Sequence, residues 1–183
     1  MKKIIYKIIF FQLMGWKIVG KMDANIKKSV MIVVPHTSWH DFYIGLFARG
    51  IIGLEMNYVA KKELFKFPFG FYFRWMGGAP LNRNSRQNTV DAISEIFQKR
   101  EIFRLAIAPE GTRKKVSDWK TGFYYIAMKA NIPIIPIAFD YFKKQVVLHE
   151  AFYPTGNIEE DFKILKANYK GVIGKIAKNS FEF

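Results

Sequence analysis

Residues 30–43 read VMIVVPHTSWHDFY and decide how the rest of the chain is interpreted. The stretch begins with five apolar residues, 30–34, of which four are β-branched. A run of this kind is typical of a strand buried in a mostly parallel sheet. Pro35 ends the strand, so His36 lies in a turn at its carboxyl end. Open α/β sheets place their chemistry at that edge.

A helix is predicted directly after this turn. Thr37 and Ser38 are both good N-caps, and we expect the helix to run from about Trp39 to Arg49. Gly50 is its expected stop, since glycine is common just after the last helical residue. The whole stretch is therefore predicted to be a strand, a turn and a helix.

Asp41 follows five residues after His36. Five residues along a regular helix are separated by roughly 500°, so their side chains face different ways. A contact requires His36 to lie outside the helix, where the capping residues place it. The carboxylate would then hold one ring nitrogen and leave the other as a general base. A capping turn with a surface histidine fits the same letters, so this pair alone does not define a site.

The composition indicates one domain with apolar surface or a large pocket. The chain has 183 residues, enough for a real core, and we expect a single domain over residues 1–183. Half of the residues are hydrophobic and 17% are aromatic, with 18 phenylalanines. That content is high for a small soluble protein and indicates exposed apolar surface or a lipid-sized pocket.

The charge favours anionic partners. Lys and Arg number 29 against 15 Asp and Glu, a net charge of +14. Nucleic acid, an anionic membrane and an acidic substrate or carrier protein all suit this charge. The absence of cysteine excludes disulfides, thiolate catalysis and cysteine-ligated metal. Histidines at 36, 40 and 149 offer a poor zinc site, and we expect no metal.

Residues 2–21 alternate lysines with large apolar residues. The uncharged run between Lys7 and Lys17 has nine residues, whereas a membrane-spanning helix needs about 20. We expect a basic amphipathic helix lying in a membrane interface, or docked on the protein's own core, and the two are compatible. One half of this helix would carry Ile4, Ile5, Ile8, Phe11, Ile18 and Val19. No signal-peptide pattern precedes it, so we expect peripheral binding at the cytoplasmic face of the membrane.

Strands and helices alternate through most of the chain. Pro133 and Pro136 remove ladder donors, so the strand that contains them is expected at an edge of the sheet or irregular. We therefore predict an α/β fold with a single mixed sheet flanked by helices. Further strands are expected at 57–60, 102–108, 132–139 and 145–152, and further helices at about 87–99, 118–130 and 157–178.

Residues 61–75 form a dense aromatic and basic stretch. Basic residues interleaved with aromatics can bind single-stranded nucleic acid. The same composition suits a hydrophobic face at a lipid interface. Pro68 and Gly70 interrupt any regular stacking platform, which favours the lipid interface, and we expect no nucleic-acid partner.

Four short motifs stand in order between residues 30 and 140. They are HTSWHD at 36–41, GGAPLNR at 77–83, PEGTR at 109–113 and IPIIP at 132–136. In this order and spacing they resemble the motifs of the glycerolipid acyltransferases, whose best-known members are the 1-acylglycerol-3-phosphate acyltransferases.

The resemblance implies roles for the matching positions. His36 would be the general base and Asp41 its orienting partner. Arg83 would bind the phosphate of the acyl acceptor, and Pro133 with Pro136 would shape the acyl-chain end of the pocket. Positions that would bind the acceptor or organise the site are Glu110, Gly111, Thr112 and Arg113.

The second motif departs from the family pattern. An acidic residue usually precedes its arginine and an aromatic residue stands in its middle, whereas this chain has Asn82 and Pro80. Loss of the acid changes the field near Arg83. The acceptor is therefore either a lyso-glycerophospholipid such as 1-acylglycerol-3-phosphate or another lyso-lipid, for example an amino-acid lipid.

The chemistry of acyl transfer suits these residues. Attack of an alcohol on a thioester needs a base and donors for an oxyanion, but no metal or cofactor. The chain has no G-x-S-x-G motif, so we expect direct attack without a covalent acyl-enzyme. The donor would be acyl-coenzyme A or an acidic acyl carrier protein. A non-catalytic basic module that binds membranes or nucleic acid is the alternative from another class.

Overall fold

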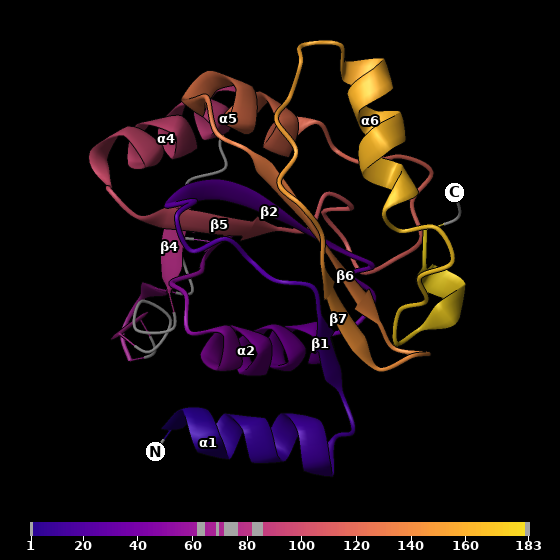
Figure 1. Cartoon of the computed structure of the whole chain (residues 1–183). Coiled ribbons are helices and arrows are strands. Elements are labelled where there is room, and N and C mark those ends of the chain that lie inside the picture. The colour runs from indigo at the N-terminus through magenta and orange to yellow at the C-terminus, as the bar shows by residue number, and fades with distance from the viewer. Residues whose placement is uncertain (1, 62–64, 69, 72–76, 82–85, 182–183) are drawn as a thin grey trace.

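Seven strands form one mixed sheet in the part of the chain that the computed structural model describes, residues 2–61, 65–68, 70–71, 77–81 and 86–181. Their order across the sheet is β1-β7-β6-β2-β5-β3-β4 (Figure 1). The α/β class and the single mixed sheet are confirmed. The strands are β1 Lys17–Val19, β2 Lys28–Val34, β3 Asn57–Lys61, β4 Gly78–Leu81, β5 Phe103–Ile107, β6 Ile134–Asp140 and β7 Gln145–Leu148.

The predicted buried strand β2 lies at the centre of this sheet. It pairs in parallel with β5 on one side and β6 on the other. β3 and β4 extend the parallel part beyond β5, whereas β7 runs antiparallel to β6 and pairs in parallel with β1. His36 thus follows the carboxyl end of a central strand.

Helices cover both faces of the sheet. α1 and α2 lie on one face, and α4, α5 and α6 lie on the other (Figure 1). Val30, Ile32 and Val34 of β2 join the core of the second layer, while Met31 and Val33 join that of the first. The apolar run of β2 is therefore continuous because both of its faces are buried. The helices are α1 Lys2–Lys7, α2 His40–Ile52, α4 Arg86–Lys99, α5 Gly122–Ala130 and α6 Ile158–Ala167.

The N-terminal segment is only partly helical, so a helix over residues 2–21 is wrong. α1 continues as a π-helix over Ile8–Leu13, and Gly15 then adopts a positive φ of 69°. The chain next forms β1, which gives β7 a partner along its outer edge. Phe10 is fully buried, while Ile4 and Leu13 are 62% and 76% exposed. The helix therefore both covers the core and presents apolar side chains outward.

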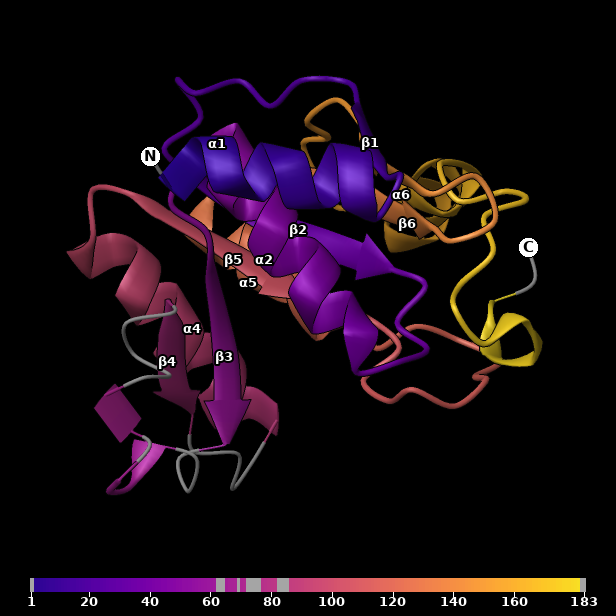
Figure 2. The same ribbon diagram turned by 90° about the horizontal axis from the view of Figure 1, so that it is seen from below.

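α2 runs further than its sequence predicts. It ends at Gly53, which has a φ of +80°, rather than at Gly50. A Cβ at Gly50 would lie 2.2 Å from the ring of Tyr6, so this glycine permits the close approach of α1 to α2. Figure 2 shows α1 lying over α2 on the outside of the molecule. The N-cap position of α2 is Trp39, one residue after the predicted cap Ser38, and Oγ of Ser38 accepts a hydrogen bond from the amide of His40 at 3.3 Å.

β6 is not an edge strand, although its prolines suggested one. It lies between β7 and β2, and all seven of its residues are buried. The pairing of β6 is irregular near Pro136, which agrees with the alternative prediction of an irregular strand. Ile134 lies opposite Phe152 and Ile137 opposite Leu148, so two residues, Ile135 and Pro136, stand opposite the three residues 149–151. A bulge of this kind accommodates the missing amide donor.

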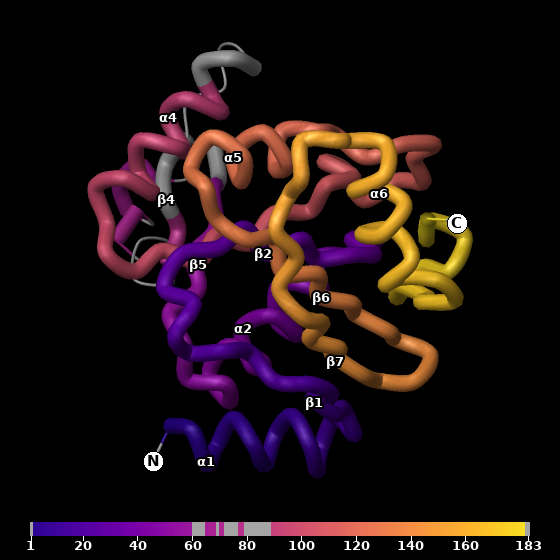
Figure 3. The backbone as a smooth tube through the Cα atoms, turned by 45° about the horizontal axis from the view of Figure 1, so that its top comes forward, coloured from indigo at the N-terminus to yellow at the C-terminus, as the bar shows by residue number. Residues whose placement is uncertain are grey.

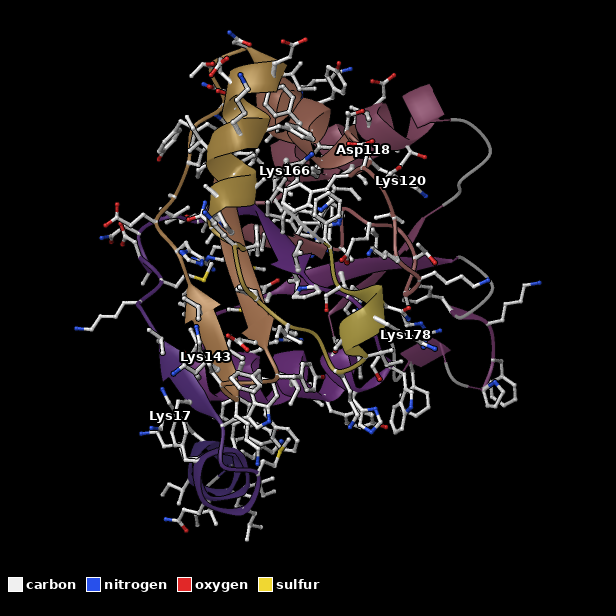
Figure 4. All side chains as sticks on the ribbon, turned by 90° about the vertical axis from the view of Figure 1, so that its right-hand side faces the viewer. Lys17, Asp118, Lys120, Lys143, Lys166 and Lys178 are labelled. Atoms are coloured by element: carbon white, nitrogen blue, oxygen red, sulfur yellow. The ribbon has the colours of Figure 1, made fainter. Side chains whose placement is uncertain are left out.

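α6 ends at Ala167, well before Lys178. Asn157 caps its start, accepting a hydrogen bond from the amide of Glu160 at 3.4 Å. Lys166 near its end lies 3.6 Å from Asp118, and Figure 4 labels both side chains. The chain then folds back beside the ends of β6 and β7 (Figure 3), where Ile173 accepts a hydrogen bond from the amide of Tyr141. This return places the C-terminal segment against the turn that carries His36.

Candidate active site

His36 and Asp41 form a hydrogen-bonded pair at the end of β2. The distance from Nδ1 of His36 to Oδ2 of Asp41 is 3.0 Å. His36 lies in the turn and Asp41 in the first turn of α2, as their spacing predicts. An ionised carboxylate can only accept hydrogen bonds, so the Nδ1 atom carries the proton. In a neutral imidazole with its proton on Nδ1, Nε2 is unprotonated, which is the form in which a histidine acts as a base.

Asp41 is held by four hydrogen-bond donors. Oδ2 accepts from His36 and from the amides of Thr37 and Ser38, both at 2.9 Å. Oδ1 accepts from the hydroxyl of Tyr141 at 2.7 Å. The side chain of Asp41 is only 3% exposed, whereas that of His36 is 32% exposed. The buried carboxylate is thus fixed, and the imidazole it orients remains accessible.

Glu110 of the third motif is hydrogen-bonded to the same turn. Its Oε2 atom accepts a hydrogen bond from the backbone amide of His36 at 2.7 Å. Burial raises the pKa of Glu110 to about 7, and the neighbouring Asp41 adds to this, while the hydrogen bond from His36 opposes it. Glu110 therefore organises the position of His36 through the backbone.

The rest of the third motif forms a tight turn after β5. Gly111 has a φ of +66°, and a Cβ there would meet Nζ of Lys120 at 2.6 Å. The amide of Lys120 donates to the carbonyl of Pro109, which closes the loop. Thr112, Arg113 and Lys120 all line the cavity that His36 reaches. The turn thus places hydroxyl and cationic groups beside the His36–Asp41 pair.

This cavity has a volume of about 1420 Å³ and is bordered by residues from both faces of the sheet. Both faces contribute because β3 pairs with β5 only at Asn57 and Tyr58 and then diverges (Figure 2). The volume exceeds the roughly 300–1,000 Å³ of ordinary ligand pockets, so a lipid fits. The apolar walls between α2 and the sheet include Met31, Val33, Leu46, Ile52, Ile137 and Phe139.

Of the predicted site residues outside the first and third motifs, only the two prolines fall within the described residues. Pro133 and Pro136 are buried in and beside β6 and are not among the described residues that border the cavity. Their neighbours Ile137 and Phe139 do border it. Arg83 and Asn82 lie outside the described residues, so the predicted phosphate contact of Arg83 stays a prediction. Pro80 lies in β4, paired with Ala60 of β3.

The other two histidines occupy different environments. Nδ1 of His40 lies 3.0 Å from Oγ of Ser38, and its ring stacks on Trp39 at 4.0 Å between centroids. His149 is near Tyr169, and burial lowers its pKa. Neither of these two histidines is hydrogen-bonded to Asp41. Within the described ranges, no three His, Asp or Glu side chains converge as metal ligands would.

Sequence reasoning missed Tyr141 and Lys120. Tyr141 directly follows β6, a buried strand parallel to β2, so its side chain emerges at the same edge of the sheet as His36. The rule that site residues follow the carboxyl ends of parallel strands could have found it, but the pairing of β6 with β2 was not predicted from the sequence. Lys120 was not singled out because lysines are frequent on the surface; Figure 4 labels several from separate elements.

Together, the fold and the site define an α/β protein with a His–Asp pair at the mouth of a largely apolar cavity. Comparison with known proteins narrows this class. The family model described as acyltransferase matches residues 16–140, more than half of the chain. The chain therefore belongs to the acyltransferase family, as its motifs indicate.

Named relatives point to the glycerolipid branch of that family. The chain is 34% identical over 122 residues to the 1-acyl-sn-glycerol-3-phosphate acyltransferase of Salmonella typhimurium, covering 63% of this chain and 48% of that protein. It is 29% identical over 130 residues to the yeast (Saccharomyces cerevisiae) protein of the same name, covering 66% and 41%. It thus spans about half the length of these relatives.

The fold has a counterpart among solved structures. The crystal structure of the 1-acyl-sn-glycerophosphate (LPA) acyltransferase PlsC from Thermotoga maritima superposes with a TM-score of 0.60 and 23% sequence identity. The match covers 91% of this chain and 74% of that chain. At this identity the likeness shows the shared fold.

Proposed function

We propose that this protein transfers a fatty acyl group from an acyl thioester to the hydroxyl of a lyso-glycerophospholipid such as 1-acylglycerol-3-phosphate, in phospholipid synthesis. The observation that carries the proposal is the 3.0 Å pair between His36 and the buried Asp41, with His36 bordering a large apolar cavity. The names of the relatives support the acceptor class.

The proposed step is a direct transfer. Nε2 of His36 takes the proton from the acceptor hydroxyl as its oxygen attacks the thioester carbonyl. Asp41 stabilises the imidazolium that forms. The tetrahedral intermediate then collapses, the carbon–sulfur bond breaks, and the departing thiolate recovers the proton from His36. The products are an ester and a free thiol, without a covalent acyl-enzyme.

The cavity has an apolar part and a cationic part, which suit the apolar and the anionic groups of the proposed substrates. The apolar walls between α2 and the sheet match a fatty acyl chain, while Arg113 and Lys120 match a phosphate. Both lysophosphatidate and the proposed donors, coenzyme A or an acidic carrier protein, are anionic, which agrees with the net charge of +14. Arg83 is proposed as a further phosphate ligand.

We also propose that the protein binds the membrane peripherally through α1. None of the helices in the described ranges combines the length and apolarity that a membrane crossing requires. Ile4 and Ile5 of α1, and Ile8 of the π-helix that continues it, are 62%, 53% and 42% exposed, with Lys3 and Lys7 beside them in the sequence. Apolar insertion and attraction to anionic lipid act together at such a surface, and the cytoplasmic leaflet carries that charge.

The test is lipid mass spectrometry of the pure protein incubated with acyl-coenzyme A or acyl carrier protein and a mixture of lyso-lipids. We expect a new diacyl product from lysophosphatidate with the wild type and none with a His36→Ala variant. A product formed only from another lyso-lipid would favour the alternative acceptor that Asn82 suggests. Absence of any acyl product with every pair of substrates would contradict the proposal.

A further inference from the structure

Within the described residues, Tyr141 donates the one hydrogen bond to the carboxylate of Asp41 that does not come from the turn around His36. The local chain saturates one oxygen of Asp41, since Oδ2 accepts from His36, Thr37 and Ser38. The other oxygen, Oδ1, accepts from the hydroxyl of Tyr141, 100 residues further along the chain, at 2.7 Å. Asp41 is 4% exposed, so water is a poor substitute for this donor.

The ring of Tyr141 is itself held in place by residues far from it in the chain. Its backbone amide donates to the carbonyl of Ile173 at 2.8 Å. Its ring packs edge to face with that of Trp16, with 4.8 Å between centroids and an interplanar angle of 89°. Trp16 is 5% exposed and packs against the fully buried Phe10. The hydroxyl therefore meets Asp41 in one defined orientation.

We infer that Tyr141 is a positioning residue of the active site, which holds the carboxylate of Asp41 in its orientation toward His36, and that Trp16 fixes the ring of Tyr141. The inference rests on the proposed function, in which His36 is the base. Burial and the neighbouring Asp41 raise the pKa of Tyr141, so the phenol keeps its proton and remains a donor. Without this donor, Oδ1 of the buried carboxylate loses its hydrogen bond, and Asp41 is held through Oδ2 alone.

Other charged groups face this pair from several elements. The carboxyl group of Glu110, after β5, accepts a hydrogen bond from the backbone amide of His36. His40, on α2, is turned toward Ser38. Lys144 and Lys175 border a smaller cavity of about 480 Å³ together with Tyr141 and Tyr43. A Tyr141→Phe change leaves all of these groups in place, so it isolates the hydroxyl.

The experiment measures the pH dependence of acyl transfer by Tyr141→Phe beside that of the wild type. The hydrogen bond offsets part of the negative charge of Asp41, the charge that attracts a protonated His36. Its loss should therefore lower kcat roughly tenfold and move the acid limb of the profile up by about one pH unit. Placing 3-fluorotyrosine, a more acidic phenol, at position 141 alone should move the limb to lower pH while keeping the fold.

A matched control exists on the opposite face of the sheet. The hydroxyl of Tyr124 donates to the buried Asp161, also at 2.7 Å, away from the cavity. Tyr124→Phe should lower the melting temperature without moving the pH profile. A folded Tyr141→Phe protein with unchanged kcat and acid limb, or an equal shift in the control, would overturn the inference.

A second measurement separates this inference from the proposed function. Titration of the His36 ring, followed by nuclear magnetic resonance without substrate, should show a higher midpoint in Tyr141→Phe than in the wild type. This readout needs no turnover, so it remains decisive if no acyl acceptor is found. An unchanged midpoint would refute the role of Tyr141, whereas an inactive wild type with the shifted midpoint would refute only the acyltransferase reaction.

Discussion

Replacing Glu110 with glutamine should change how the stability of this protein depends on pH. The pKa of Glu110 is raised from 4.5 to about 7, chiefly by burial. The folded state therefore binds a proton between pH 4.5 and 7 that the unfolded state has released. Under this condition the free energy of unfolding falls as the pH rises through that window. Glutamine has nearly the same shape and cannot ionise.

The magnitude follows from the pKa shift. A shift of about 2.5 units corresponds to up to about 3 kcal/mol, and solvent reaching the carboxyl reduces it. Between pH 4.5 and pH 7, the free energy of unfolding of the wild type should fall by this amount relative to that of Glu110→Gln. Above pH 7 the difference should remain constant. The hydrogen bond from the amide of His36 survives in the variant, because the glutamine oxygen still accepts it.

The assay is urea unfolding of both proteins at pH 5, 6, 7 and 8, followed by circular dichroism. The difference between their free energies of unfolding removes the contributions that other groups make equally to both. We expect the free energy of unfolding of the variant to increase relative to that of the wild type with each step up to pH 7. A difference that stays constant with pH, or changes in the wild type's favour, would refute the reasoning about Glu110.

Three further outcomes are expected. His36→Ala should lower turnover about 10²–10⁴-fold with the fold intact, measured by circular dichroism and product formation, and near-normal turnover would exclude it as the base. Arg83→Ala should raise the KM for the lyso-lipid far more than that for the thioester, at a cost of roughly 1.5–3 kcal/mol; a defect confined to the thioester would count against this role. Ile4→Asn with Ile8→Asn should reduce sedimentation with anionic vesicles, while Ile164→Asn, at a position whose exposure of 53% lies between theirs, should not; undiminished binding would argue against anchoring by α1.

The membrane test uses substitutions rather than removal of residues 1–21. Deletion would take away Phe10 and Trp16, which are buried, and β1, which pairs with β7. A truncated chain would therefore lose part of its core together with the exposed isoleucines. Because Ile4 and Ile8 make up exposed surface, changing them leaves that core untouched.

Local sequence determined the strand, the turn and the helix around His36. The apolar run, the proline and the capping residues act on positions close to them in the sequence. The interactions that they specify can therefore be predicted from the local sequence alone. The same holds for the His36–Asp41 contact, whose partners are five residues apart. Helix ends were predicted less well, because Gly50 serves the packing of Tyr6 and not the end of α2.

Contacts between distant segments were decided only in the tertiary structure. Residues 17–19 fit the apolar pattern of a helix, yet they form β1, because β7 offers an unpaired edge whose hydrogen bonds a local pattern does not encode. Glu110 reaches His36 across 74 residues and Tyr141 reaches Asp41 across 100. Periodicity tells which face of an element is buried, whereas the partner of each buried polar group depends on the order of strands in the sheet. The sequence by itself therefore determined the contact between His36 and Asp41, and the packing of β5 and β6 beside β2 decided which side chains hold the two residues.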